Sequence, residues 1–310
     1  MNSRVYMVAG HRFAVVSNLP DTAGLDLFAL MDNYEPFAER SADGNAPESP
    51  LFTLAVESSV ALPGFIEETR QEDEGQEILC GHDDAGSSMF NFRLRGADMG
   101  TLLCLPGYAQ ARLVVPDILN LNSVKFAVNN SLMVLYALAT ARLGTALFHS
   151  ATVDYHGKGY MFLGKSGTGK STHARLWLRY NEGSTLLNDD NPVVRFFAPE
   201  SPENVARAVV YGSPWSGKTP CYKNECLPLG GIVLLSQAPF NKIERLRGVK
   251  AYAALVPSIS GKRWERLIAD GLHYTENALA SNVPVWSLEC LPDEGAARLC
   301  RETIVDGFDG

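Results

Sequence analysis

Long hydrophobic runs are missing from this sequence of 310 residues. A membrane-spanning helix needs about 20 consecutive apolar residues. The longest apolar stretch, residues 132–143, is shorter than that and contains Arg142. The start, Met-Asn-Ser-Arg-Val-Tyr, also lacks the apolar core of a secretory leader. We therefore expect no membrane partner and a cytoplasmic location.

Cysteine is scarce, and basic residues are outnumbered by acidic ones. The six cysteines form no Cys-x-x-Cys pair, so the sequence predicts neither a disulfide framework nor a zinc site and indicates a reducing compartment. Lys and Arg total 27 against 35 Asp and Glu, which gives a net charge of −8. That charge repels a polyanion unless a local basic groove exists, so nucleic acid is not an expected partner.

What is present is the composition of an ordinary globular protein, with 46% hydrophobic and 20% charged residues. The length favours two domains. Short apolar runs separated by turn residues continue to about residue 115, and from Val124 the apolar period becomes helical. We therefore expect an antiparallel β-rich domain over residues 1–122, which binds a partner or covers the active site, and an α/β domain over residues 123–310.

A glycine-rich motif dominates the second domain. The apolar strand at residues 159–163 runs into Gly-Lys-Ser-Gly-Thr-Gly-Lys-Ser, which fits the P-loop pattern G-x-x-x-x-G-K-[ST]. Glycines allow successive backbone N–H groups to wrap phosphate oxygens, and the following helix contributes its positive end. The nucleotide-binding residues we predict are Gly164, Lys165, Ser166, Gly167, Thr168, Gly169, Lys170, Ser171 and Thr172, with Lys170 also placed among the catalytic residues.

A pair of carboxylates follows the expected helix at residues 171–180. Leu186-Leu187 leads into Asn188-Asp189-Asp190, and a strand of this length returns the chain to the level of the loop. A right-handed βαβ unit would therefore place Asp189 and Asp190 beside the phosphates. Paired carboxylates there serve both Mg²⁺ coordination and activation of a hydroxyl.

A histidine precedes the loop on an expected strand, residues 145–154. If His156 and Gly157 form the turn of a hairpin, Tyr155 pairs with Lys158, and Ala151 pairs with Phe162. His149 then falls opposite the first loop glycine. It is either a catalytic residue that touches the phosphate loop or a satisfied core histidine, and the sequence leaves both open.

A second loop, Gly212-Ser-Pro-Trp-Ser-Gly-Lys-Thr-Pro220, has the small residues and the cation of a phosphate-facing loop. A surface turn with a packed Trp215 explains the same residues and is the preferred interpretation.

The stretch from Phe148 through the glycine-rich loop to Asp190 resembles the catalytic core of the HPr kinase/phosphorylase family. The resemblance covers roughly residues 140–310, with its specific motifs at residues 148–190. It implies a P-loop kinase core on a fold related to phosphoenolpyruvate carboxykinase, preceded here by the smaller β-rich domain. It also implies ATP and Mg²⁺ as cofactors and transfer of phosphate to a seryl hydroxyl.

By position in that family, Lys170 would hold the β- and γ-phosphates. Ser171 and Asp190 would bind Mg²⁺, and Asp189 would accept the proton of the acceptor hydroxyl. The two aspartates can exchange these roles. The Gly-Arg-Asn-bearing loop of the HPr enzymes is missing, so we expect an acceptor other than HPr: another protein, a peptide or a small molecule.

Two other functions fit the same motifs. A carboxykinase-like lyase would form ADP in the presence of oxaloacetate, and a nucleotide-binding switch would bind ATP without transferring a group. The aspartate pair argues against the switch, because a pure binder has little use for two carboxylates near the γ-phosphate. The sequence leaves oligomeric state open, a homo-oligomer included.

Overall fold

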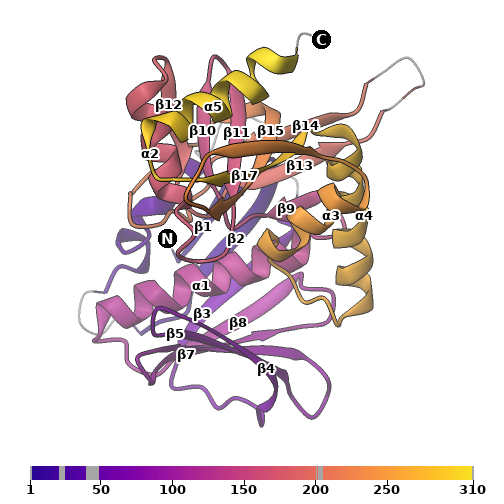
Figure 1. Ribbon diagram of the computed structural model, residues 1–310. Coiled ribbons are helices and arrows are strands. Elements are labelled where there is room, and N and C mark those ends of the chain that lie inside the picture. Colours follow the sequence, from indigo (N-terminus) through magenta and orange to yellow (C-terminus); the bar gives the residue numbers. More distant parts are fainter. Residues whose placement is uncertain (1, 21–24, 40–48, 200, 202–204, 309–310) are drawn as a thin grey trace. The chain divides into compact units, whose positions relative to one another are not determined.

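The computed structural model describes residues 2–20, 25–39, 49–199, 201 and 205–308. The chain is a mixed α/β protein of two compact units, residues 1–139 and 140–310, each with its own sheet (Figure 1). The division lies at the end of helix α1 (Leu121–Thr140), not at its beginning near residue 122. Helical periodicity marks where this helix starts but does not tell which sheet it covers.

The described part of the first unit forms an eight-stranded sheet in the order β1-β2-β3-β8-β7-β6-β5-β4. The expectation of a purely antiparallel sheet is wrong, because β2 pairs with β3, and β3 with β8, in parallel. A long connection follows β2 and lets the chain re-enter in the same direction. The strands are β1 (Ser3–Val8), β2 (His11–Ser17), β3 (Phe52–Ser58), β4 (Ile66–Asp73), β5 (Gln76–His82), β6 (Ser88–Leu94), β7 (Ala97–Cys104) and β8 (Gln110–Val115), with 3-10 helices η1 (Leu27–Ala29) and η2 (Asp32–Phe37) after β2.

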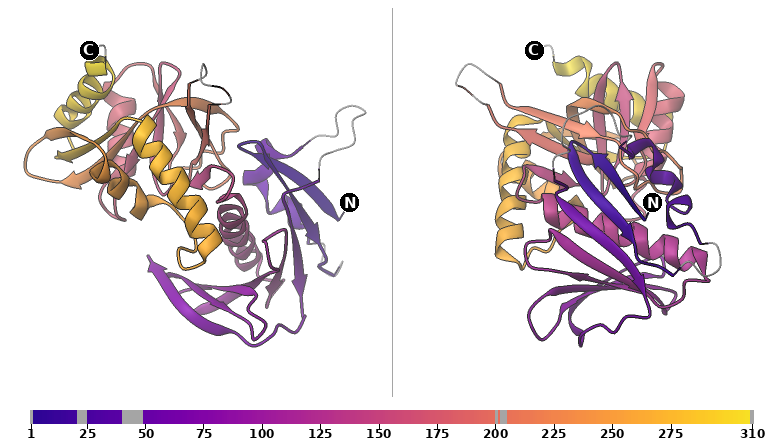
Figure 2. Two further views of the ribbon diagram at one scale, coloured as in Figure 1. Left: turned by 90° about the vertical axis from the view of Figure 1, so that its right-hand side faces the viewer. Right: turned by 180° about the vertical axis from the view of Figure 1, so that it is seen from behind.

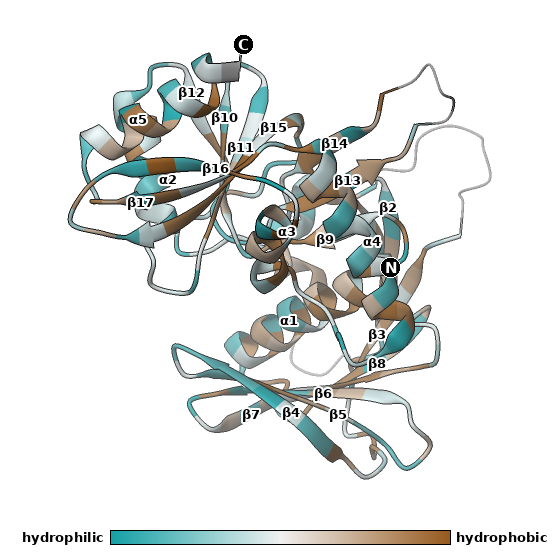
Figure 3. Ribbon diagram, turned by 45° about the vertical axis from the view of Figure 1, so that its right-hand side comes forward, coloured by the Kyte–Doolittle hydropathy of each residue, from teal (hydrophilic) through white to brown (hydrophobic). Residues whose placement is uncertain are grey.

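Helix α1 lies along one face of this sheet (Figures 1 and 2). Tyr136 is fully buried, and its hydroxyl donates to the backbone oxygen of Val8 at 3.0 Å. Phe13 stacks on Phe52 with ring centroids 5.0 Å apart and meets Tyr136 edge-on. At the far edge, β4 is exposed and hydrophilic along most of its length (Figure 3), as expected of an edge strand that avoids pairing with another chain.

The second unit contains a nine-stranded sheet with a main path β12-β10-β11-β15-β14-β13-β9, and β17 and β16 attached beside β15. Its strands are β9 (Thr145–Leu147), β10 (Ala151–Tyr155), β11 (Lys158–Leu163), β12 (Ser184–Asn188), β13 (Val193–Phe197), β14 (Arg207–Tyr211), β15 (Cys226–Gln237), β16 (Lys242–Leu246) and β17 (Val285–Cys290). Its helices are α2 (Lys170–Tyr180), α3 (Val249–Leu255), α4 (Arg266–Asn282) and α5 (Glu294–Ile304), with 3-10 turns η3 (Val256–Ser258) and η4 (Asp306–Phe308). No helix in the described residues of either unit is long and apolar enough to cross a membrane.

The hairpin register predicted before the glycine-rich loop is confirmed. Tyr155 pairs with Lys158, and Ala151 pairs with Phe162. The turn residues His156 and Gly157 both have positive φ, 51° and 77°, the backbone of a tight hairpin turn. The turn therefore fixes which residues of β10 face which residues of β11.

The strand expected over residues 145–154 is interrupted, because its middle bonds to three different segments. The backbone N–H of Phe148 donates to Pro192, that of His149 to Ser258, and that of Ser150 to Asp190. Residues 145–147 accordingly belong to β9, which pairs with β13, while β10 begins at Ala151. His149 therefore does not lie on one continuous strand with Ala151.

The crossover through α2 returns the chain to the same edge of the sheet. β12 is antiparallel to β10, and β10 is antiparallel to β11, so β12 and β11 run in the same direction. One strand, β10, separates them. The carboxyl ends of β11 and β12 and the start of β10 therefore meet at one edge.

The core beneath α2 contains a buried histidine. His173 is 2% exposed, and the indole N–H of Trp177 donates to its Nε2 at 3.2 Å. The ring meets Phe162 edge-on at 4.7 Å. Burial lowers the pKa of His173 to about 4, so this side chain is neutral in the folded protein at pH 7.

Because this imidazole is buried and neutral, we predict that the free energy of unfolding decreases in mild acid. In the unfolded chain His173 takes up a proton near pH 6.5, and in the folded chain only near pH 4. The contribution of this residue to the free energy of unfolding is therefore fully present above about pH 6.5 and is lost as the pH decreases. The loss amounts to about 2 kcal/mol between pH 7 and pH 5. His173→Gln, which keeps an acceptor for Trp177 but does not titrate, should remove most of it.

The measurement is urea unfolding at pH 7 and pH 5, followed by tryptophan fluorescence. All four tryptophans, residues 177, 215, 264 and 286, lie in the second unit, so the signal reports that unit alone. His156→Asn, at an exposed hairpin turn, is the control and should behave as the wild type. Equal pH dependence in wild type and His173→Gln would contradict the prediction.

Candidate active site

The glycine-rich loop, residues 164–169, joins β11 to α2 as predicted. Gly164, Gly167 and Gly169 all have positive φ, at 154°, 78° and 107°. A Cβ on Gly164 would lie 3.1 Å from the Thr168 Cβ and 3.3 Å from the Leu235 backbone oxygen, so a larger residue would distort the loop. A Cβ on Gly167 would have no atom within 4 Å, so that side of the loop is open.

Lys170 opens helix α2 and folds back over the loop. It is 8% exposed, and its Nζ donates to the backbone oxygens of Gly164 at 3.1 Å and Lys165 at 3.5 Å. The loop is also tied to the end of β15, since the Gln237 side chain donates to the Gly167 oxygen at 3.2 Å. The ammonium group is thereby held at the loop and at the positive end of α2.

The two aspartates at the end of β12 differ in their surroundings. Asp189 is 6% exposed, and its Oδ2 accepts the backbone N–H of Thr219 at 3.2 Å. The side chain of Asp190 is 32% exposed, and its Oδ1 lies 3.8 Å from Nε2 of His149. Asp190 is therefore the more accessible of the two carboxylates.

His149 lies at the break between β9 and β10, with 41% of its side chain exposed. It is therefore not the satisfied core histidine that was one of the two predictions. Its Nε2 lies 3.8 Å from Asp190 Oδ1. The register that would have put it opposite Gly164 does not extend beyond Ala151.

The loop at residues 212–220 contacts both aspartates, which the interpretation as a surface turn did not include. Trp215 is packed, as expected, at 5% exposed. A Cβ on Gly217 would lie 3.2 Å from the Asp190 Cβ. Together with the bond from Thr219 to Asp189, this close approach makes the loop a wall of the site.

Two residues that the sequence did not single out hold this wall in place. The Asn188 amide donates to Ser213 Oγ and to the Trp215 oxygen, both at 3.2 Å, and its Oδ1 accepts the backbone N–H of Asp190 at 2.9 Å. Ser213 Oγ donates to the Asn191 oxygen at 2.6 Å. The only sequence signal was a polar Asn directly after an apolar strand.

Oxygen donors lie on two of these segments, Ser171 in α2 and the aspartate pair after β12. Among the described residues no group of three or more His, Cys, Asp or Glu side chains could hold a metal ion. Magnesium in phosphoryl-transfer sites takes one or two protein oxygens and completes its shell with phosphate and water. Ser171 and one aspartate would supply such a pair.

No protein-family model matches the chain, and no curated protein matches it. A solved structure of the HPr(Ser) kinase/phosphatase from Coxiella burnetii is similar at 13% sequence identity and a TM-score of 0.28, over 53% of this chain and 95% of that one. The fold itself is that of a mixed α/β protein with two sheets.

Proposed function

We propose that the protein is an ATP- and Mg²⁺-dependent kinase of the HPr-kinase-like P-loop type, which transfers the γ-phosphoryl group to a hydroxyl of a protein, peptide or small molecule. The observation that carries the proposal is the meeting of three segments at one sheet edge. These are the glycine-rich loop after β11, the start of β10 with His149, and the end of β12 with its two aspartates.

The glycine-rich loop would hold the nucleotide. Its backbone N–H groups and the first turn of α2, with Ser171 and Thr172, provide donors for phosphate oxygens. The Lys170 ammonium, now bonded to loop carbonyls 3.1 and 3.5 Å away, would exchange them for the β- and γ-phosphates. Exchange of neutral for anionic acceptors strengthens these bonds.

The different surroundings of the aspartates favour a division of roles opposite to that suggested by motif position. Asp190 is the more exposed and faces His149, so it would accept the proton of the acceptor hydroxyl. Asp189 is buried and oriented by the Thr219 N–H, so it would be the metal ligand with Ser171. The hydroxyl oxygen would bond to the γ-phosphorus as the bond from phosphorus to the β–γ bridging oxygen breaks, with ADP leaving. Bound Mg²⁺ would neutralise charge on the phosphates.

The experiment is incubation of the full chain with γ-labelled ATP, Mg²⁺ and a cell extract, followed by gel and thin-layer separation. The proposal predicts label in an acceptor and loss of that label with Asp189→Ala plus Asp190→Ala. Calorimetric ATP binding without transfer to any acceptor would favour the nucleotide-binding switch. ADP formation that depends on oxaloacetate would favour the lyase.

A further inference from the structure

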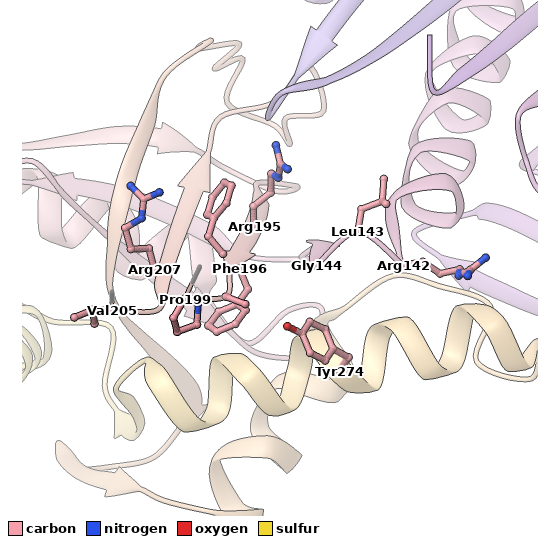
Figure 4. A pocket seen from close by; sticks show the side chains of 11 residues that line it. Arg142, Leu143, Gly144, Arg195, Phe196, Pro199, Val205, Arg207 and Tyr274 are labelled. Carbon is pink, nitrogen blue, oxygen red and sulfur yellow. The ribbon is translucent and has the colours of Figure 1, made fainter. Parts of the chain in front are cut away.

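A basic groove lies on the second unit beside the β13–β14 hairpin (Figure 4). Its volume is about 660 Å³, and its described lining includes Arg142, Arg195 and Arg207 but no Asp or Glu. The whole chain has a net charge of −8. Among the described lining residues, three cations and no acid contrast with the net negative charge of the chain.

The strand register holds two of these arginines on one face. Phe197 pairs directly with Arg207, and Arg195 lies two residues before Phe197 on the same strand, so all three side chains point to the same side of the sheet. The guanidinium carbons lie 4.9 Å and 5.5 Å from the Phe197 ring centroid. Stacking on the Phe197 ring restricts both guanidinium groups.

The third arginine is brought to the groove by a close approach of two backbones. Gly144 has φ of 64°, accepts a bond from the Phe196 N–H at 2.8 Å, and could not carry a Cβ without a contact of 2.8 Å to the Phe196 oxygen. Arg142 lies two residues earlier. In Figure 4 Arg207 and Arg142 stand at opposite ends of the groove, with Arg195 and Tyr274 between them.

The groove is connected to the proposed active site by two paired strands. β9 begins at Thr145 beside the groove and leads to His149, and β13 runs from the aspartates toward Arg195, which pairs with Thr145. Arg195 follows Asp190 by five residues, about 16 Å of extended chain. An extended peptide of about five residues has the length of this separation.

We propose that this groove binds an extended acidic peptide segment of the phosphoryl acceptor, several residues from the hydroxyl that receives the phosphate. Cations placed along a line suit a series of carboxylates, whereas a compact phosphate would require donors that converge on one point. The assignment to the acceptor rests on the proposed kinase function. The claim that the groove binds an acidic peptide does not rest on that function.

The first measurement is fluorescence anisotropy of the full chain with a labelled peptide of alternating Glu and Gly, and a matched peptide with Gln in place of Glu. The Glu peptide should bind more tightly, and added salt should weaken it. Arg142→Gln with Arg207→Gln should weaken it about five- to tenfold, the sum expected of two exposed ion pairs. Arg266→Gln, whose side chain is 92% exposed on α4, is the matched control and should leave binding unchanged.

Equal binding of the Glu and Gln peptides, no effect of the double variant, or tighter binding of a labelled oligonucleotide would overturn the proposal. The second measurement is transfer of labelled phosphate to extract proteins. There the double variant should lower transfer, and the Glu peptide should compete with the acceptor. Peptide binding without any transfer would refute the kinase function and leave the acidic-peptide site standing. Transfer that is unaffected by the double variant would refute the assignment to the acceptor.

Discussion

We expect Asp190→Asn to lower phosphoryl transfer by about 10²–10⁴-fold, the contribution of a positioned general base, and to leave ATP affinity close to that of the wild type. The reason is the position of this carboxylate, whose side chain is 32% exposed and lies 3.8 Å from His149. Asparagine has the same shape but does not accept a proton at neutral pH. The loss should therefore fall on kcat and not on nucleotide binding, which is measured separately by calorimetry.

The control for this prediction is Asp270→Asn, an exposed aspartate on α4 that pairs with Arg266, and it should behave as the wild type. Asp189→Asn provides the contrast, because a metal ligand that is lost should also weaken Mg²⁺-dependent ATP binding. If Asp190→Asn weakens Mg²⁺-dependent binding and Asp189→Asn does not, the two roles are reversed. If neither variant changes transfer, the aspartate pair is not part of the reaction.

Lys170→Ala should weaken ATP binding by about ten- to a hundredfold, as expected for loss of a hydrogen bond to a charged group. Transfer should fall further, by about 10²–10³-fold, because in the proposed reaction the same ammonium would stabilise the charge that develops on the departing ADP. Lys170 is nearly buried and is held at the loop by its bond to the Gly164 oxygen.

The control is Lys158→Ala, at the opposite end of β11, where the side chain is exposed in the hairpin. ATP titration calorimetry and initial transfer rates on both variants and on the wild type give the comparison. Unchanged ATP affinity in Lys170→Ala would show that the glycine-rich loop is not where the nucleotide binds.

The parts of the site that the sequence predicted are those set by local chemistry. Turn residues with positive φ at His156 and Gly157 fixed the β10–β11 register. The apolar strand, glycines and helix start placed the loop between β11 and α2. Strand and helix lengths brought the end of β12 to the same edge, although β10 lies between β12 and β11.

The parts that the sequence did not predict depend on partners distant along the chain. The strand is interrupted at His149 because the backbone N–H groups of residues 148–150 donate to Pro192, Ser258 and Asp190. No local sequence pattern predicts this interruption. The loop at residues 212–220 is held beside the aspartates by the bond from Asn188 to Ser213 and by the bond from the Thr219 N–H to Asp189. Contacts between residues this far apart in the sequence can be identified only in the folded structure.

The central claim is that the glycine-rich loop and the aspartate pair bind one metal–triphosphate from two sides. Its most direct test is a crystal structure with Mg²⁺ and a non-hydrolysable ATP analogue. We predict phosphate oxygens on the backbone N–H groups of residues 164–170 and on Lys170 Nζ, with the metal held by Ser171 and an aspartate, and the γ-phosphate facing Asp190. A nucleotide bound elsewhere, or in the loop but with the aspartates out of reach of the γ-phosphate, would contradict the account.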